Sequence, residues 1–241
     1  PGLPVTLASL TFDPMHNEGG HDGGHAGHAA PPMAGMDHGD MAGTSAPMQS
    51  HPASETDNPL VIQSLLSRGF DPNTVNPKGL PALLLAIKLS ANKATKLLLE
   101  QPSLRVEVRS PEDESPLMLA AFVGDMDLCA VLIAKDADVN KTGWTPLHYA
   151  ATNAHIPVVR LLLENFAYID AASPNGSTPL MMAAMYGNSS VVKLLLESGA
   201  DPSLKNSKGL TAMDFARQAK KDESMEIIGA FVRALRPKGV W

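Results

Sequence analysis

Residues 145–151 read Thr-Pro-Leu-His-Tyr-Ala-Ala, and variants of this stretch recur along the chain. The clearest copies are residues 115–121 (Ser-Pro-Leu-Met-Leu-Ala-Ala), 178–184 (Thr-Pro-Leu-Met-Met-Ala-Ala) and 211–216 (Thr-Ala-Met-Asp-Phe-Ala), and residues 81–86 (Pro-Ala-Leu-Leu-Leu-Ala) form a degenerate fifth. The positions equivalent to Pro146 are 82, 116, 146, 179 and 212, which gives spacings of 34, 30, 33 and 33 residues. A period of this length is the signature of a repeat architecture.

A second apolar run follows each copy and ends in a turn. The clearest run is residues 191–202, Val-Val-Lys-Leu-Leu-Leu-Glu-Ser-Gly-Ala-Asp-Pro. We therefore expect two short helices per repeat. Threonine can cap the first helix, proline fits its first position, and Gly199 can end the second helix because glycine tolerates a positive φ. The expected helix pairs are 82–89 with 92–100, 116–123 with 126–135, 146–153 with 156–165, 179–186 with 189–198, and 212–220 with 222–235.

The Thr-Pro-Leu-His-Tyr-Ala-Ala stretch, together with Gly199-Ala200-Asp201, resembles the ankyrin repeat over about residues 59–236. The resemblance implies an all-α solenoid of helix-turn-helix repeats with β-turn fingers, made of an N-terminal half repeat and about five repeats. Such repeats bury their apolar faces by stacking on one another. The arrangement also resembles that of secreted or periplasmic bacterial ankyrin proteins. This implies a periplasmic or secreted location, although one cysteine is equally compatible with the cytoplasm.

Two segments depart from the repeat pattern. The 30-residue spacing shortens the finger between Asp138 and Thr145, which predicts a clipped turn with Trp144 at its tip. Residues 59–72 match a second helix and its turn, so the first helix of that repeat would lie near 49–57, where Pro52 is interior and apolar residues are scarce. Three interpretations stay open: the tail folds over the exposed edge, the first repeat frays, or residues 1–55 were joined to a truncated domain.

The first 58 residues have a different composition. They contain nine Gly, seven Pro, six His and five Met, and their seven acidic residues are accompanied by no Lys or Arg. A tract of this kind cannot bury enough apolar surface to offset its ordering entropy, so we predict that it is disordered. The predicted organisation is a tail (1–58), a repeat domain (59–236) and a C-terminal tail (237–241).

The tail also carries candidate metal ligands. Thioethers suit Cu(I), imidazoles suit Cu(II), Zn(II) and Ni(II), and the interspersed glycines would let the chain wrap an ion. The stretch from Met33 to Met41 resembles the Met/His-rich repeats of bacterial copper-resistance proteins. No cofactor is required by the repeat domain, so copper is the candidate ligand of the tail alone, and a histidine-rich solvated linker explains the same composition. The candidate ligands are His16, His21, His25, His28, Met33, Met36, His38 and Met41.

The sequence offers no catalytic motif. We find no phosphate-binding G-x-x-x-x-G-K-[ST], no G-x-S-x-G elbow and no H-E-x-x-H. His148 and His155 occupy positions where the repeat often has histidine, and their expected role is backbone hydrogen bonding between neighbouring fingers. Cys129 lies among apolar residues of a second helix, where we expect a small buried side chain. The single cysteine excludes an intramolecular disulfide and a cysteine-based zinc site. We therefore expect a protein that is not an enzyme.

Charge and hydropathy narrow the class of partner. The net charge of −6 resides in the tail, residues 59–241 carry about +1, and no basic cluster of the kind that binds nucleic acid is present. No apolar run approaches the 18 residues of a membrane span. These features predict a monomer that binds a protein partner of unknown identity.

The resemblance implies that this partner binds through the finger tips and the exposed side of the first helices. Mapping those positions puts an apolar row on the concave face. Exposed aromatic residues in a groove are typical anchors for a protein partner. The alternative is that some of these side chains pack on adjacent fingers. The predicted partner-binding residues are Phe122, Trp144, Asn153, Met185 and Tyr186.

Overall fold

The computed structural model describes residues 59–235. Contacts divide the chain into two units, Pro1–Gln49 and Ser50–Trp241, and all described residues belong to the second. The predicted disordered tail, its candidate metal ligands and the C-terminal tail lie outside the described residues. So does the segment 49–57 that would form the first helix of the first repeat, and its three interpretations stay open.

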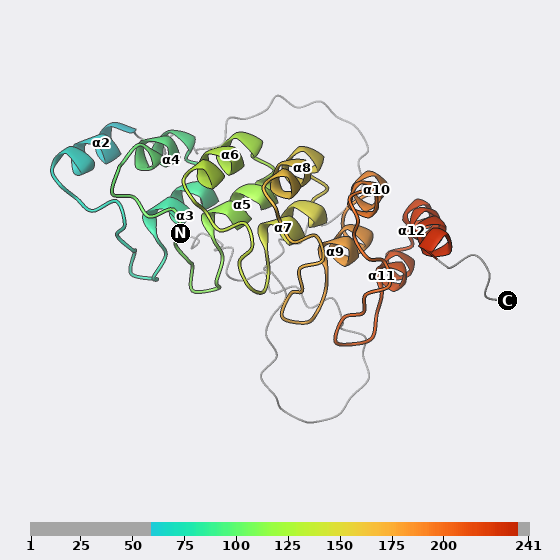
Figure 1. Cartoon of the computed structure of the whole chain (residues 1–241). Coiled ribbons are helices and arrows are strands. Elements are labelled where there is room, and N and C mark those ends of the chain that lie inside the picture. Colours follow the sequence, from blue (N-terminus) through green and yellow to red (C-terminus); the bar gives the residue numbers. More distant parts are fainter. Residues whose placement is uncertain (1–58, 236–241) are drawn as a thin grey trace, which may run out of the picture. The chain divides into compact units, whose positions relative to one another are not determined.

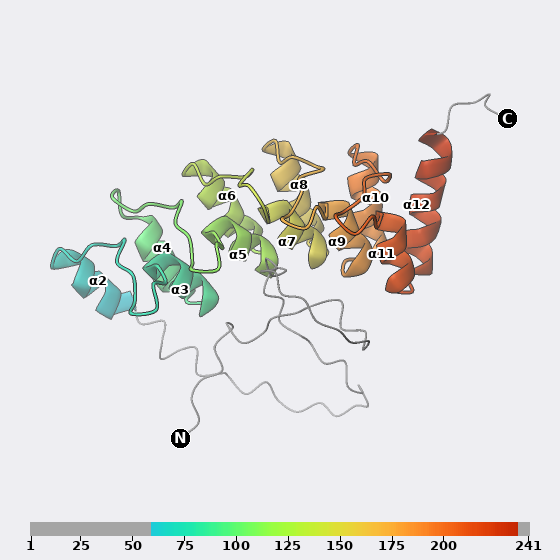
Figure 2. The ribbon, with the colours of Figure 1, turned by 90° about the horizontal axis from the view of Figure 1, so that it is seen from below.

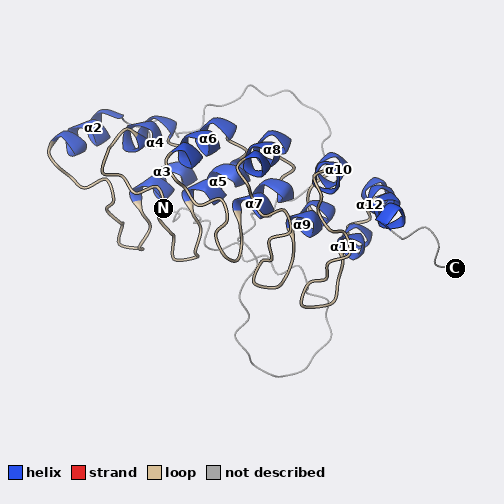
Figure 3. Cartoon of the chain, in the orientation of Figure 1, coloured by secondary structure: helices blue, strands red, loops and turns tan. Residues whose placement is uncertain are grey.

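Two rows of helices form the repeat domain (Figure 1; Figure 3). The inner row consists of α3 (Ala82–Lys88), α5 (Pro116–Val123), α7 (Pro146–Thr152), α9 (Pro179–Met185) and α11 (Ala212–Gln218). The outer row consists of α2 (Pro59–Ser67), α4 (Asn92–Leu99), α6 (Met126–Ala134), α8 (Ile156–Glu164), α10 (Ser189–Glu197) and α12 (Asp222–Leu235). The predicted helix pairs are confirmed: each starts at the expected residue, and the ends differ by at most two residues.

Fingers connect each outer helix to the next inner helix. Within residues 59–235 they contain no strand and a single isolated bridge, between Val75 and Pro81. No helix in this part of the chain is long and apolar enough to span a bilayer.

Local capping explains where the inner helices begin. The side chains of Ser115, Thr145, Thr178 and Thr211 each accept a hydrogen bond from the backbone N–H three residues further on. The side chain at that third position bonds back to the N–H of the cap, which completes a capping box. Proline follows the cap in α5, α7 and α9, where its missing N–H costs no bond. These local interactions define the starts of α5, α7, α9 and α11, whereas Pro81, the N-cap of α3, makes no side-chain hydrogen bond.

Stacking of the repeats forms one continuous core. Inner helices pack on inner helices, and Figure 2 shows the two rows running side by side from α2 to α12. Alanine pairs such as Ala150-Ala151 are fully buried, and their small side chains allow adjacent inner helices to approach closely. The bulky leucines that fill the core from both rows are fully buried as well: Leu117, Leu132, Leu147, Leu162, Leu180 and Leu195. Each repeat therefore depends on its neighbours for burial of its apolar face.

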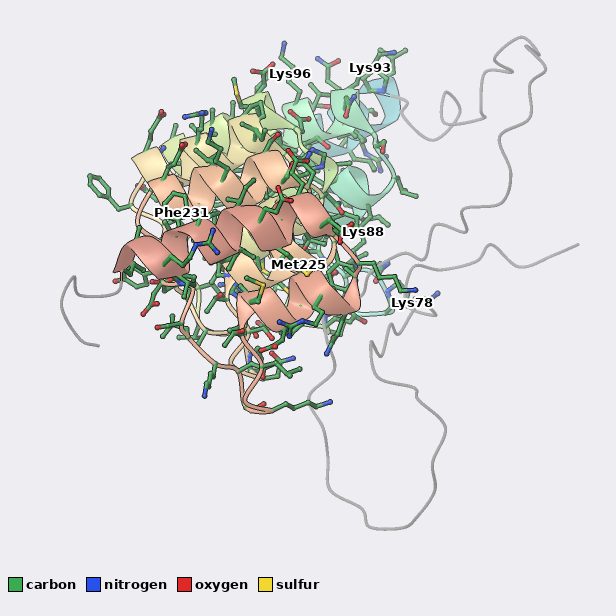
Figure 4. All side chains as sticks on the ribbon, turned by 90° about the vertical axis from the view of Figure 1, so that its right-hand side faces the viewer. Lys78, Lys88, Lys93, Lys96, Met225 and Phe231 are labelled. Atoms are coloured by element: carbon green, nitrogen blue, oxygen red, sulfur yellow. The ribbon has the colours of Figure 1, made fainter. Side chains whose placement is uncertain are left out.

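The last helix closes one end of the stack. In α12, Ser224 and Ile228 are buried against α10 and α11, and Met225 and Phe231 are half-buried beside them. Figure 4 views this end, with Met225 and Phe231 labelled on α12.

Packing along the outer row is interrupted once. Helix α2 packs on α4, α6 on α8, α8 on α10 and α10 on α12. Between α4 and α6 lies an open cleft of about 590 Å³, lined by apolar residues such as Leu99 and Val131 and by charged residues such as Lys96 and Asp127. The first two outer helices therefore join the others chiefly through the inner row.

A line of polar side chains ties successive fingers together. In each of four repeats a side-chain oxygen accepts a hydrogen bond from a backbone N–H of the next repeat, at 2.7–3.1 Å. The acceptor and donor pairs are Asn73 with Arg105, Glu107 with Asp138, Asn140 with Tyr168, and Asp170 with Asp201. Burial raises the pKa of Asp170, and the hydrogen bond from Asp201 N offsets only part of this effect. These directional bonds fix the register between fingers.

The short finger between Asp138 and Thr145 differs from its prediction. Trp144 does not lie at the tip, because its half-buried ring packs against the core at the base of the finger. The exposed residue of the turn is Thr142. Lys141 is buried, where its ammonium donates to the carbonyl of Thr142 at 2.9 Å and pairs with Asp113 of the preceding finger. The inward orientation of Trp144 removes its large indole ring from water. The repeat pattern in the sequence did not predict this orientation.

Candidate functional site

The predicted partner-binding residues lie at the ends of inner helices and at one finger base. Phe122 is in the last turn of α5, Asn153 follows α7, and Met185 and Tyr186 end α9. Asn153 is exposed, whereas Phe122, Trp144, Met185 and Tyr186 are half-buried. The alternative that some of these side chains pack on their neighbours therefore holds for Phe122, Trp144 and Met185, which all contact the core.

Trp144 packs on the histidine of the next helix. Its ring lies edge-on to the ring of His148, with centroids 5.2 Å apart and an interplanar angle of 80°. The His148 Nε2–H donates to the carbonyl of Ser177 in the next finger at 2.9 Å, and Nδ1 accepts from the backbone N–H of Thr145 at 3.2 Å. Burial lowers the pKa of His148 to about 4, so the ring is neutral at physiological pH. The predicted role of His148 in bonding between fingers is confirmed.

The indole N–H of Trp144 is a polar group without a partner. Its Nε1 is buried and has no hydrogen-bond acceptor among residues 59–235. Leaving a buried donor unpaired costs on the order of 1–3 kcal/mol.

Phe122 and Asn153 are linked by their own hydrogen bonds and ring contacts. The Phe122 ring lies edge-on to Tyr149 at 6.0 Å between centroids. Its carbonyl accepts from Asn153 Nδ2 at 2.7 Å and from His155 Nε2 at 3.0 Å. The end of α5 is therefore fastened to the loop that follows α7. His155 bonds to the backbone of the preceding repeat as expected, but at the end of α5 and not in a finger.

The repeat register identifies surface residues that the sequence prediction missed. In two repeats the second position after the alanine pair is more exposed than the first: Val123 is 57% exposed although Phe122 is half-buried, and Asn153 is exposed although Thr152 is buried. Leu89, at the equivalent position of an earlier repeat, is 48% exposed. We name the inner-end row the residues at this second position, which are Leu89, Val123, Asn153 and Tyr186. Leu89 and Val123 occupy the same position of the repeat as the predicted residues Asn153 and Tyr186. This shared position was the sequence signal that could have identified them.

Buried charges lie close to this row. Lys88 Nζ is 2.6 Å from Glu114 Oε2, and the Glu114 side chain is only 4% exposed. In the same finger Asp113 pairs with Arg109 and with the buried Lys141. Burial, reinforced by the negative charge of Glu114, raises the pKa of Tyr149. Since an unpaired buried charge is costly, these pairs hold the second and third fingers in one arrangement.

The other candidate reactive group is the thiol of Cys129, which lies in the core. Cys129 is fully buried in α6, and burial, with a smaller contribution from Asp125, raises the pKa of its thiol to about 12. A thiol of this kind forms little of the thiolate that attacks substrates. Within residues 59–235 no group of three or more His, Cys, Asp or Glu side chains could hold a metal ion.

Comparisons with known proteins agree with this geometry. A family model described as "Ankyrin repeats (3 copies)" matches residues 51–142 and 103–173, and one described as "Ankyrin repeats (many copies)" matches residues 162–216. The chain is 31% identical over 173 residues to the Gallus gallus nuclear factor NF-kappa-B p105 subunit, an alignment covering 69% of this chain and 17% of that protein. It is 30% identical over 177 residues to the Mus musculus B-cell lymphoma 3 protein homolog, covering 70% of this chain and 40% of the relative.

A third relative matches a smaller segment. The Rattus norvegicus ankyrin repeat and SAM domain-containing protein 6 is 30% identical over 109 residues, which is 44% of this chain and 12% of that protein. The chain thus spans less than half the length of each of these relatives. The family models cover more than half of the chain, and their matched residues coincide with the stacked helix pairs. The chain belongs to the ankyrin-repeat family.

Proposed function

We propose that this protein is a non-enzymatic interaction module that binds a protein partner through the inner-end row and the finger base at Trp144. Membership of the ankyrin-repeat family supports binding of a protein in general. The partner and the concave-face site remain our proposals. The site would comprise the predicted residues Phe122, Trp144, Asn153, Met185 and Tyr186, with Leu89 and Val123 added by the register of the repeats.

The observation that carries the proposal is apolar exposure at the ends of the inner helices, together with an unpaired donor at the base of one finger. Leu89 and Val123 leave about half of their side-chain surface in water. At the finger base that precedes α7, the buried Trp144 Nε1–H lacks an acceptor among the described residues. A partner that covers the row would remove apolar surface from water and could offer the indole a carbonyl oxygen.

The test is a peptide selection followed by measurement on variants. Phage-displayed random dodecamers are selected on the immobilised full chain, and the affinity of a selected, labelled dodecamer is measured by fluorescence anisotropy. We expect Trp144→Phe combined with Tyr186→Ala to weaken binding at least 30-fold. Trp144→Phe keeps a ring against His148 and removes only the N–H and part of the ring, so the fold persists.

The matched control is Val75→Ser, which changes an exposed apolar residue of the first described finger. We expect this variant to bind like the native chain. Selected peptides that bind the Trp144/Tyr186 variant with native affinity would refute the proposed site.

We also retain copper handling by the tail as a second proposal, since the stretch from Met33 to Met41 supplies three thioethers and an imidazole within nine residues. The expected result is Cu(I) binding by the full chain in competition with a chromophoric chelator, lost when Met33, Met36 and Met41 are changed to Leu and His38 to Gln. Equal, weak binding by both chains would leave the tail as a linker. The periplasmic or secreted location likewise remains a proposal.

A further inference from the structure

The turn after α8 exposes two aromatic side chains that folding does not explain. Phe166 is 84% exposed and Tyr168 is 67% exposed. Phe166 is the most exposed of the large apolar residues in the described part of the chain. Neither ring contributes to the core, and large exposed apolar groups that gather in one place mark interaction surfaces.

Phe166 also has an unfavourable backbone conformation. Its φ is +62°, in the left-handed region that bulky residues avoid. The equivalent turn positions of other repeats are occupied by Gly69, Asp136 and Gly199, residue types that tolerate this region better. A phenylalanine at this position costs stability and gains no burial in return, which points to a role outside folding.

The turn is nevertheless held firmly. Asn140 of the preceding repeat donates from Nδ2 to the carbonyl of Phe166 at 2.8 Å, and its Oδ1 accepts from the backbone N–H of Tyr168 at 2.7 Å. These two bonds fix the backbone that carries both rings. The backbone that carries the rings is thus ordered before a partner binds, which lowers the entropic cost of binding.

Carboxylates flank the two rings in the neighbouring turns. Asp136 and Asp138 lie in the turn before, Asp201 lies in the turn after, and Glu164 ends α8. Hydrogen bonds from Ser203 lower the pKa of Asp201, so this group is ionised at neutral pH. The one cation in these three turns is Lys135. The surroundings of the aromatic pair are therefore net negative.

In the turn after α2 an aromatic ring does contact a cation, although Phe70 occupies the repeat position of Ala167. There the guanidinium of Arg68 lies over the ring of Phe70, 5.6 Å from its centroid. In the turn after α8 the residue equivalent to Arg68 is Asn165, whose amide donates to the carbonyl of Leu161. Within residues 59–235 no cation lies over Phe166 or Tyr168. Aromatic faces bordered by carboxylates are suited to guanidinium groups, which stack on the rings and pair with the acids.

We propose that Phe166 and Tyr168, with the flanking carboxylates, form a second docking surface that binds an arginine-rich segment of a protein partner. This surface is distinct from the inner-end row, because the two helices of a repeat run in opposite directions and the turn after α8 lies at the other end of the pair from Asn153 (Figure 1). The two surfaces can therefore be tested separately.

The test measures binding of a fluorescein-labelled dodecapeptide of four Arg-Gly-Ser units to the full chain by anisotropy at 150 mM NaCl. A peptide with citrulline in place of arginine reports any binding that needs no charge. We expect Phe166→Gly combined with Tyr168→Ser to weaken binding of the arginine peptide at least tenfold. Because neither substitution changes a charge, general attraction to the acidic residues of the chain is the same in both proteins.

Thermal unfolding distinguishes loss of the surface from loss of the fold. Phe166→Gly relieves the strained φ, so we expect its melting temperature to equal or exceed that of the native chain. Should the double variant melt lower, Phe166→Asn with Tyr168→Asn replaces it, since asparagine tolerates a positive φ. The matched control Val123→Ser, on the inner-end row, should bind the peptide normally.

Three results would overturn the proposal: no binding of the arginine peptide by the native chain, equal binding by the native and variant chains, or equal binding of the citrulline peptide. Sedimentation velocity adds a fourth, because self-association that disappears in the variant would assign the rings to a contact between two copies. None of these results bears on the inner-end row, so each proposal can fail alone.

Discussion

Replacing Gly187 with alanine is expected to destabilise the repeat domain by roughly 3 kcal/mol, the upper end of the usual cost of overpacking. Gly187 is buried where the chain leaves α9, and an added Cβ would lie 2.6 Å from the carbonyl oxygen of Ala151 and 2.9 Å from that of Ala183. Both atoms belong to the backbone, so α7 and α9 would have to separate. For a domain of this size the melting temperature should fall by roughly 6–12 °C.

Gly199→Ala is the matched control for this prediction. Gly199 has a φ of +100°, but nothing lies within 4 Å of the position of its Cβ. Its replacement should cost only the backbone strain, about 1 kcal/mol. Thermal unfolding followed by circular dichroism measures both variants. Equal melting temperatures for the two would contradict the close approach of the turn to α7.

Lowering the pH from 6.5 to 4 should remove about 3 kcal/mol of stability through His148 alone. Burial lowers the pKa of this ring from 6.5 to about 4 in the folded state, so the unfolded state binds the proton more readily between these values. Stability should thus be constant with respect to His148 above pH 6.5 and decline progressively toward pH 4. The magnitude follows from about 1.4 kcal/mol for each pH unit of difference in pKa.

Urea unfolding at pH 7.5, 6.5, 5.5 and 4.5 measures this effect, and His148→Met is the variant to compare. Methionine occupies the equivalent position in two other repeats, as Met118 and Met181, where its sulfur accepts from the N–H of the cap at 3.4 Å. We expect the variant to lose the decline between pH 6.5 and 4.5. Hydrogen bonds lower the pKa of Asp71, Asp201 and Asp214, and their contributions are lost only below their ordinary value of 3.8. Parallel stability curves for the two proteins would show that His148 does not control the acid response.

Local features of the sequence predicted most of the fold. Thr145 and Pro146 define a helix start within four residues, and Leu147 repeats with a period that only stacked units explain. The roles of His148, His155 and the environment of Cys129 also followed from position within the repeat. The helix starts, the roles of the two histidines and the burial of the cysteine depend on residues that are close in sequence or occupy equivalent positions in neighbouring repeats.

The candidate sites were less predictable because they depend on contacts and on backbone conformation. The inward turn of Trp144 requires the ring of His148 beside it, and no pattern encodes that choice. Phe122 is half-buried because its ring contacts Tyr149, whereas Val123, the last residue of α5, is exposed. The sequence did not predict which of the two would make this contact. Phe166 directly follows the predicted helix 156–165, and only its positive φ and its exposure separate it from the core residues around it.

The open cleft between α4 and α6 has a consequence for how this domain unfolds. In a linear array each repeat is stabilised by its interfaces with its two neighbours, so the weakest interface sets the boundary between cooperative units. The interface between the α3/α4 repeat and the α5/α6 repeat has the cleft where its outer helices would otherwise pack. This interface depends on the contact of α3 with α5 and on the ion pair of Lys88 with Glu114. The segment from α2 to α4 can therefore detach while α5 to α12 stay folded, as a subglobal opening of lower free energy than complete unfolding.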